Sequence, residues 1–206
     1  MKDFGLVVIG AHFGVWLEEE ISKYSKQNII LVEPVPYNLS ILEKKYSGLK
    51  NISICKNAIF SENSIKNFYF VDENSIPKLG KHWASAIGSF DKKHILNHRS
   101  KRFKIENSDI KEIKIEFITF DKLVEKYSIR SIDKLQIDVE GAEYEILKTI
   151  NLKNIKINQI LFESKHFDGT FKEGEKLTEI KNKLVSEGYK LSQIDNENIL
   201  AKKNYL

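Results

Sequence analysis

Short apolar runs alternate with helical patterns along most of the chain, and this alternation constrains the fold more than any other feature. Residues 6–9 are continuously apolar and residues 28–33 nearly so, as expected for strands that are buried on both faces of a sheet. Further strands are expected at 52–54, 66–71, 113–117, 135–138 and 157–163, with helical stripes between most of them. The order predicts an α/β fold with a mostly parallel sheet and helices on both faces.

Two more strand-like stretches lie at residues 189–194 and 198–201, on either side of the turn Asp195-Asn196-Glu197. Such a hairpin adds one antiparallel strand, which we expect at the edge of the sheet. A length of 206 residues suits one core, so we interpret residues 1–206 as a single domain. Ligands bind these sheets outside the carboxyl ends of the strands, so residues that directly follow a strand are the functional candidates.

Periodicity is lost in residues 72–110, which we call the basic segment. Between Lys78 and Lys104 it has eight Lys or Arg residues and one acid, Asp91; this stretch therefore carries +7, and the rest of the chain −3. We expect the basic segment to be an insertion or lid beside the ligand site. A solvated basic loop would have the same composition, and both interpretations stay open at this point.

The cysteine content and the hydropathy of the chain bear on its location. Cys55 is the only cysteine, so an internal disulfide is impossible and nothing indicates an oxidising compartment. No apolar stretch is long enough to span a membrane. We therefore expect a cytoplasmic protein with no membrane span.

A turn with two glycines, Gly10-Ala11-His12-Phe13-Gly14, follows the first strand. Glycine allows a tight bend and close approach to a ligand, and the next helix offers free N–H groups. The G-x-G-x-x-G pattern of dinucleotide-binding folds is absent, which disfavours a nicotinamide oxidoreductase. Ligand binding and a plain tight turn both explain this pattern.

Glu33 ends the second strand, 19 residues after Gly14. In nucleotide-binding α/β folds an acid at this place accepts hydrogen bonds from ribose hydroxyls. A carboxylate suits a neutral ribose and disfavours a 2′-phosphate. The spacing favours ribose binding over the alternative of a surface glutamate before a proline.

Acidic residues crowd the end of another strand, in Gln136-Ile137-Asp138-Val139-Glu140-Gly141-Ala142-Glu143. Acids near a helix N-terminus also cap the helix and complement its dipole, and Glu143 is expected to do only that. Asp138 lies where the sheet meets its ligand, so it is the stronger functional candidate.

The acidic motif Asp138-Val139-Glu140-Gly141-Ala142-Glu143 resembles the signature of the FkbM family of S-adenosylmethionine-dependent methyltransferases. Other landmarks of the family occur in order: Val8-Ile9-Gly10-Ala11-His12-Phe13-Gly14, Glu33-Pro34, Asn57-Ala58, Phe120-Asp121-Lys122-Leu123 and Leu161-Phe162-Glu163. The similarity extends over roughly residues 6–166. It implies a Rossmann-like class I methyltransferase fold with a seven-stranded, mostly parallel sheet.

The resemblance also implies a cofactor, S-adenosylmethionine, and methyl transfer to a hydroxyl of a small molecule or sugar. Gly10, Ala11, His12 and Gly14 would face the methionine part of the cofactor. Glu33, followed by Pro34, would hold the ribose, Asn57 and Ala58 would lie near the adenine, and Asp138 would lie near the sulfonium. Two positions depart from the family pattern, because Val8 replaces an acid and His12 replaces the usual Asn.

A hydroxyl acceptor needs a base to remove its proton, and Asp138, Glu163 and His166 are the catalytic candidates. Histidine titrates near neutral pH, which favours His166 chemically, although a loop histidine without a role would look the same. Asp138 and Glu163 could instead hold a divalent cation. The sequence offers no obvious third ligand, so no metal is expected.

The basic segment is expected to bind the acceptor through Trp83, Ser85, Ser89, Arg99 and Arg102. Aromatic rings beside hydroxyls suit sugar faces, and arginines suit a phosphate or carboxylate on a small-molecule or saccharide acceptor. Two other interpretations remain. The protein could methylate a ribose 2′-hydroxyl of nucleic acid, which the basic charge favours, although no nucleic-acid-binding motif accompanies it. It could also be a catalytically inactive binding module, which Val8 favours.

Overall fold

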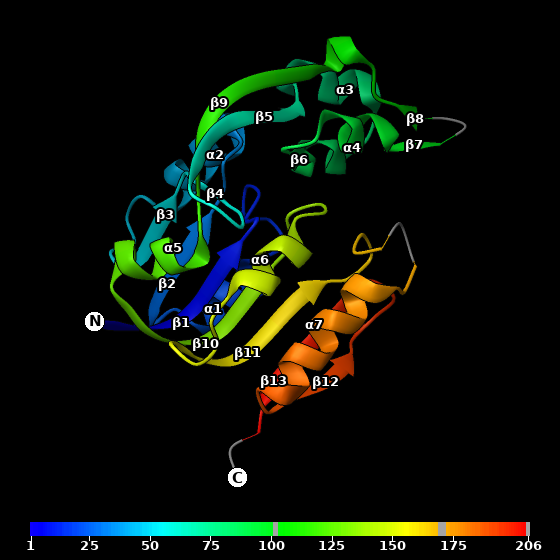
Figure 1. Cartoon of the computed structure of the whole chain (residues 1–206). Helices are drawn as coiled ribbons and strands as arrows, with labels where there is room; N and C mark the ends of the chain where they lie inside the picture. The colour runs from blue at the N-terminus through cyan, green and yellow to red at the C-terminus, as the bar shows by residue number, and fades with distance from the viewer. Residues whose placement is uncertain (101–102, 169–171, 205–206) are drawn as a thin grey trace.

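The computed structural model describes residues 1–100, 103–168 and 172–204. The main elements, drawn in Figure 1, are β1 (Lys2–Ile9), α1 (Glu18–Lys23), β2 (Asn28–Val32), α2 (Pro36–Tyr46), β3 (Ile52–Cys55), β4 (Ala58–Ile59), β5 (Ser64–Val71), α3 (Ile76–Leu79), β6 (Gly88–Ser89), α4 (Lys92–Asn97), β7 (Arg99–Ser100), β8 (Phe103–Lys104), β9 (Ile110–Ile118), α5 (Phe120–Tyr127), β10 (Ile129–Ile137), α6 (Glu143–Thr149), β11 (Lys156–Glu163), α7 (Glu175–Ser186), β12 (Tyr189–Gln193) and β13 (Asn198–Lys203). None of the helices among these residues combines the length and apolar composition that crossing a membrane requires.

In the described residues a seven-stranded sheet has the order β12-β13-β11-β10-β1-β2-β3. The neighbouring strands β11, β10, β1, β2 and β3 run parallel to one another. Val7 of β1 lies opposite Ile30 of β2 on one side and opposite Leu135 of β10 on the other. The α/β architecture and the mostly parallel sheet were predicted correctly. Their cause is visible in β1 and β2, whose apolar runs are buried from both faces.

Helices cover the sheet on both faces, as predicted. On one face Leu6 and Val8 of β1 pack with Leu42 and Tyr46 of α2 and with Ile21 of α1. The alternate residues of β1 face α5, α6 and α7, which contribute Leu123, Ile146, Leu147, Ile180 and Leu184 to the larger core cluster. The side chain of Val8 is fully buried, so this position belongs to the apolar core and not to the ligand side of β1.

The C-terminal hairpin lies at one edge of the sheet, as expected, and its strands β12 and β13 pair antiparallel. β13 pairs with β11 on one side and β12 on the other, so β12 is the edge strand. The side chains explain this order. Ile199 and Ala201 of β13 are buried, whereas Lys190, Ser192 and Gln193 leave β12 largely exposed. A polar strand is tolerated at an edge, and an apolar strand is stabilised by neighbours on both sides.

A second sheet of the described residues, β4-β9-β5-β6, carries the basic segment. β5 and β9 pair over their whole length as an antiparallel ribbon that rises from the main sheet (Figure 1). The sequence shows no periodicity in residues 72–110, yet the described residues of this segment form short helices and strands around their own small core. Val71, Ala84, Ile87, Ile95 and Ile105 make up that core and are almost fully buried. A merely solvated loop is therefore excluded.

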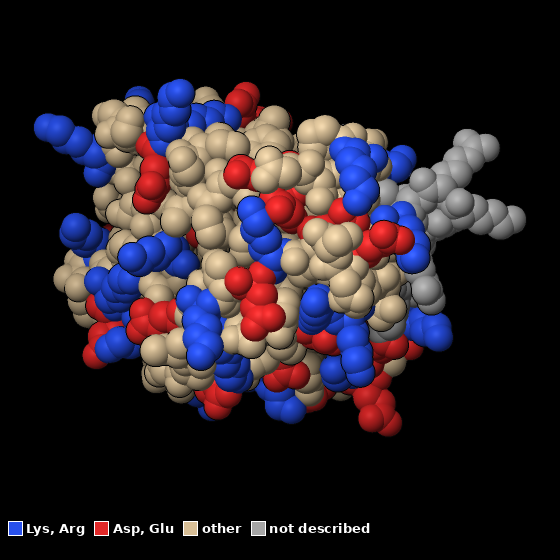
Figure 2. Space-filling view, turned by 90° about the horizontal axis from the view of Figure 1, so that it is seen from above, with Lys and Arg blue, Asp and Glu red and all other residues tan. Residues whose placement is uncertain are grey.

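Two lysines of the basic segment pair with acids at its border. Lys78 pairs with Asp109 at 2.6 Å, and Lys104 lies 3.2 Å from Glu106. Figure 2 looks onto the side of the molecule where the segment lies and shows Lys and Arg interspersed with Asp and Glu. Among the described residues, that face therefore carries charges of both signs.

Candidate functional site

A cavity of about 350 Å³ lies between the carboxyl ends of the main strands and the basic segment. The ends of β1, β2, β10 and β11 supply one wall, and the basic segment supplies the other. Its lining includes Ile9, Gly10, Ala11, His12, Trp16, Glu33, Pro34, Ala58, Phe60, Trp83, Ser89, Phe90, Gln136, Asp138, Glu140, Glu163, Lys165 and Glu197. The size lies within the range of small-molecule sites.

The glycine turn after β1 is bent sharply at Gly10, where φ is +91°. A Cβ atom at Gly10 would lie 1.7 Å from the carbonyl oxygen of Asp138, so no other residue fits without moving the backbone. The N–H groups of Gly10 and Ala11 both donate to the carbonyl of Val32. These contacts bring the ends of β1, β2 and β10 together. Gly14 instead packs against α2 and is not part of the cavity lining.

Glu33 is buried at the end of β2, with 4% of its surface exposed. One carboxylate oxygen accepts a hydrogen bond from the backbone N–H of His12, and the other from Val35, both at 2.9 Å. Burial raises the pKa of Glu33 to about 7, and the two N–H donors oppose this shift. The carboxylate thus fixes the glycine turn and also lines the cavity.

His12 connects the glycine turn to the basic segment. Its backbone has φ +51°, and its Nε2 lies 2.8 Å from the hydroxyl oxygen of Ser85. Burial lowers the pKa of His12 to about 4, so the ring is neutral at physiological pH. Its Nδ1 is buried without a hydrogen-bond partner among the described residues, and the ring stacks on Trp16 with centroids 5.0 Å apart.

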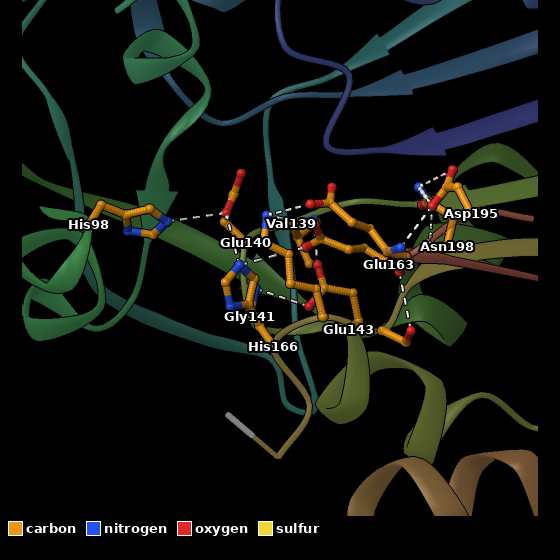
Figure 3. Close-up of polar contacts among 12 residues, drawn as sticks. His98, Val139, Glu140, Gly141, Glu143, Glu163, His166, Asp195 and Asn198 are labelled. Atoms are coloured by element: carbon orange, nitrogen blue, oxygen red, sulfur yellow. Dashed lines mark hydrogen bonds and ion pairs between the residues drawn. The ribbon is translucent and has the colours of Figure 1, made fainter. Parts of the chain in front are cut away.

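The loop that follows β10 is organised by Glu143. One of its oxygens accepts from the N–H of Val139 at 2.7 Å and the other from Gly141 at 3.0 Å (Figure 3). We expected Glu143 to cap its own helix, but its carboxylate instead holds the loop before the helix. Glu143 is 1% exposed, and burial raises its pKa to about 8. Glu140 has φ +56° in this loop, an unusual conformation that such contacts can maintain.

The catalytic candidates differ in their surroundings. Asp138 is exposed to the cavity, where desolvation and the neighbouring Glu140 raise its pKa to about 6. Glu163 is more deeply buried, and burial, followed by the charge of Asp138, raises its pKa to about 9. His166 is not part of the cavity lining; its Nε2 lies 3.7 Å from Glu140 and 4.0 Å from Glu163. Asp138 is therefore the candidate that is both accessible and ionised near neutral pH.

The structure brings most of the residues singled out by the sequence to one cavity. Those that line it are Gly10, Ala11, His12, Glu33, Pro34, Ala58, Trp83, Ser89, Asp138 and Glu163. Ser85 is not part of the lining, because its hydroxyl is directed to His12. Arg99 lies in β7 with its side chain outside the described part of the structure, and Arg102 lies outside the described residues.

Asn57 also stays outside the cavity lining, contrary to expectation. Its amide nitrogen donates to Glu116 at 2.7 Å, and its amide oxygen accepts from Lys126 at 2.7 Å. The next residue, Ala58, does line the cavity. The segment after β3 therefore reaches the cavity through Ala58, whereas the side chain of Asn57 is hydrogen-bonded to Glu116 and Lys126.

Sequence reasoning missed several lining residues and one possible third acid. Trp16, Phe60, Gln136 and Lys165 line the cavity, but no local pattern in the sequence indicates this. Glu143 supplies a ligand atom within 4.8 Å of ligand atoms of Asp138 and Glu163. Both oxygens of Glu143 already accept backbone hydrogen bonds, so this acidic group does not by itself indicate a metal.

Comparison with known proteins identifies a family. The model of the methyltransferase FkbM domain matches residues 9–191. No curated protein sequence matches the chain. Among solved structures, methyltransferase FkbM from Methylobacillus flagellatus KT has 13% identity and a TM-score of 0.55, covering 97% of this chain and 43% of that one. The fibrillarin pre-rRNA processing protein of Methanococcus jannaschii has 13% identity and a TM-score of 0.48, covering 98% and 67%. This chain thus spans less than half the length of the FkbM structure.

Proposed function

The chain belongs to the FkbM methyltransferase family, and on this premise we propose that it uses S-adenosylmethionine to methylate a hydroxyl oxygen of a small-molecule or saccharide acceptor. One observation carries the proposal. The bent glycine turn, the buried carboxylate of Glu33 and the exposed carboxylate of Asp138 line a single cavity at the carboxyl ends of the sheet strands. Ligands of open α/β sheets bind at this place.

The lining fits the parts of the cofactor. The bend at Gly10 lets the backbone of the glycine turn form part of the cavity wall, and the buried Nδ1 of His12 still lacks a partner among the described residues. Glu33 would accept hydrogen bonds from the ribose hydroxyls. Ala58 and Phe60 offer an apolar surface for the adenine. Asn57 and Gly14 are not included in this assignment, because other contacts hold them away from the cavity.

The bound cofactor supplies a methyl group on a positively charged sulfonium. Asp138 would take the proton from the acceptor hydroxyl, because its carboxylate faces the cavity and is largely ionised at neutral pH. A base so placed contributes about 10²- to 10⁴-fold to the rate. Glu163 retains its proton at neutral pH and therefore does not serve as this base. The remaining work of the site is alignment of the acceptor and exclusion of water.

The basic segment would bind the acceptor and cover the site as a lid. Trp83, Ser89 and Phe90 line the cavity from this side and combine aromatic faces with a hydroxyl, as a sugar ring requires. Lys165 lies on the same lining and would suit an anionic group on the acceptor. Ser85 would act indirectly, because its hydroxyl lies 2.8 Å from Nε2 of His12 and positions that ring.

The two other functions make different predictions. A nucleic-acid methyltransferase should bind RNA or DNA with a steep dependence on salt. The ion pairs of Lys78 and Lys104 with neighbouring acids disfavour this function. An inactive module should not bind the cofactor product at all. Val8 packs in the apolar core, and the residues proposed to hold the cofactor line the cavity without it, which supports an active site.

Calorimetric titration with S-adenosylhomocysteine tests the cofactor site, and a panel of acceptors with labelled S-adenosylmethionine tests the reaction. We expect one binding site and label transfer to a saccharide or small alcohol but not to RNA. Binding without transfer to any hydroxyl acceptor would contradict O-methylation. Absence of binding would support the inactive module.

A further inference from the structure

His94, His98 and His166 gather around Glu140 at the border of the cavity. His94 and His98 are four residues apart at the end of α4, so a helical turn places both on one side. Glu140 belongs to the loop after β10, and His166 to the loop after β11. Figure 3 shows the carboxylate of Glu140 between the rings of His98 and His166. These ligand-forming side chains therefore come together from distant parts of the chain.

The distances are close to those of a metal centre. One oxygen of Glu140 lies 3.6 Å from Nε2 of His98 and 3.7 Å from Nε2 of His166. The ligand atoms of His94, His98 and Glu140 all lie within 4.8 Å of one another. Metal–ligand bonds of about 2.0–2.1 Å in a tetrahedral zinc site place ligand atoms roughly 3.4 Å apart. Small side-chain rotations would therefore be sufficient to bind an ion.

The imidazole nitrogens are arranged as ligands. Nδ1 of His98 lies 3.0 Å from the carbonyl oxygen of His94 and can donate to it, so Nε2 is the nitrogen that faces Glu140. Metal-bound histidines use the same support from a carbonyl. Nε2 of His94 and Nε2 of His166 are buried and have no hydrogen-bond partner among the described residues. The His166 side chain is only 10% exposed.

Unmatched polar atoms at this depth cost free energy unless a ligand satisfies them. Asp91, Glu197 and Lys165 also lie close to the cluster, so two acids accompany one cation. Such surroundings favour a divalent ion.

We propose that His94, His98, His166 and Glu140 bind one divalent transition-metal ion of the zinc class. Nitrogen ligands with one carboxylate suit zinc and its neighbours better than magnesium or calcium. Four protein ligands complete a tetrahedral shell, which is typical of structural sites. The ion would fasten α4 of the basic segment to the loops after β10 and β11. The proposal does not rest on the methyltransferase reaction.

Protein without a histidine tag, freed of metal by a chelator, is titrated with Zn²⁺ and separately with Co²⁺. We expect one equivalent of either ion, the visible absorption of tetrahedral Co²⁺, and a higher melting temperature with Zn²⁺. His94→Gln, His98→Gln and His166→Gln should each weaken binding at least about tenfold. Glu125→Ala is the control, because it removes a surface carboxylate, paired with Lys122, that belongs neither to the cluster nor to the cofactor site, and it should leave metal binding unchanged.

Several results would overturn the proposal. They are absence of stoichiometric binding, unchanged affinity in all cluster variants, or an equal loss of affinity in Glu125→Ala. Circular dichroism identifies a variant that does not fold, and the remaining histidine variants then decide the question. Metal binding is measured without cofactor, and S-adenosylhomocysteine binding is measured separately on the same protein. A failed metal site is therefore distinguishable from a failed cofactor site.

Discussion

Replacing Glu33 tests the cofactor site most directly. The carboxylate is 4% exposed and accepts two backbone hydrogen bonds at 2.9 Å, so few other arrangements are open to it. Glu33→Ala removes the proposed acceptor for the ribose hydroxyls and should weaken S-adenosylhomocysteine binding by about 1–3 kcal/mol. This corresponds to roughly a 5- to 150-fold higher dissociation constant. Glu125→Ala is the control, because Glu125 lies on the surface and pairs with Lys122.

The pKa of Glu33 adds a test by pH. The carboxylate form accepts ribose hydrogen bonds best, so cofactor affinity should fall as the pH drops below about 7, by up to about tenfold per unit. The stability of the ligand-free protein should change in the opposite direction. A folded-state pKa raised from 4.5 to about 7 stabilises the fold at low pH, and about 3 kcal/mol is lost as the pH rises through this window.

Isothermal titration calorimetry from pH 5 to 9 measures the affinities, and thermal melts at the same pH values measure stability. Glu33→Gln cannot ionise and should flatten both profiles. Unchanged cofactor affinity in Glu33→Ala, with the fold intact, would refute the ribose assignment. A wild-type pH profile that Glu33→Gln leaves unaltered would show that another group is responsible.

Three further substitutions probe other parts of the site. Gly10→Ala should unfold the protein or abolish cofactor binding, because its Cβ would collide with the carbonyl of Asp138; a normal melt and normal binding would contradict this geometry. Glu143→Ala should destabilise the fold by about 2–5 kcal/mol in a denaturant titration, since the N–H groups of Val139 and Gly141 lose their acceptor, and a loss below 1 kcal/mol would count against that role. Asp138→Asn should lower kcat by about 10²- to 10⁴-fold while S-adenosylhomocysteine still binds, and an unchanged kcat would exclude Asp138 as the base.

Much of the main sheet could be predicted because its signals are local. Each of three elements can be recognised from its own residues alone: β1 and β2 by their buried apolar runs, and α7 by its apolar stripe. β10 is longer than expected, beginning at Ile129 and not near Leu135, because polar residues in its first half interrupt the apolar pattern. Likewise the order of β12 and β13 depends on contacts with β11, which no local pattern reports.

The site residues also include some that local sequence signals identify and others that depend on tertiary contacts. Glu33 and Asp138 were found because a strand end is a position that the sequence reveals. The role of Glu143 was missed, since an acid in the first turn of a helix has the same pattern whether it caps the helix or holds the preceding loop. The spacing of His94 and His98 is visible in the sequence, but His166 joins them only through the fold.

The structure of the basic segment could not be predicted from the sequence, yet this segment bears on function. Its helices are too short to be stable alone, so they depend on tertiary contacts. Some of these contacts reach the cofactor side. The carbonyl of Ser85 accepts a hydrogen bond from Asn38 at 2.9 Å, and its hydroxyl lies 2.8 Å from His12. Contacts with the glycine turn therefore help to set the position of the basic segment, which is the proposed acceptor-binding side of the cavity. A change in the turn should shift the segment, and a change in the segment should shift the turn.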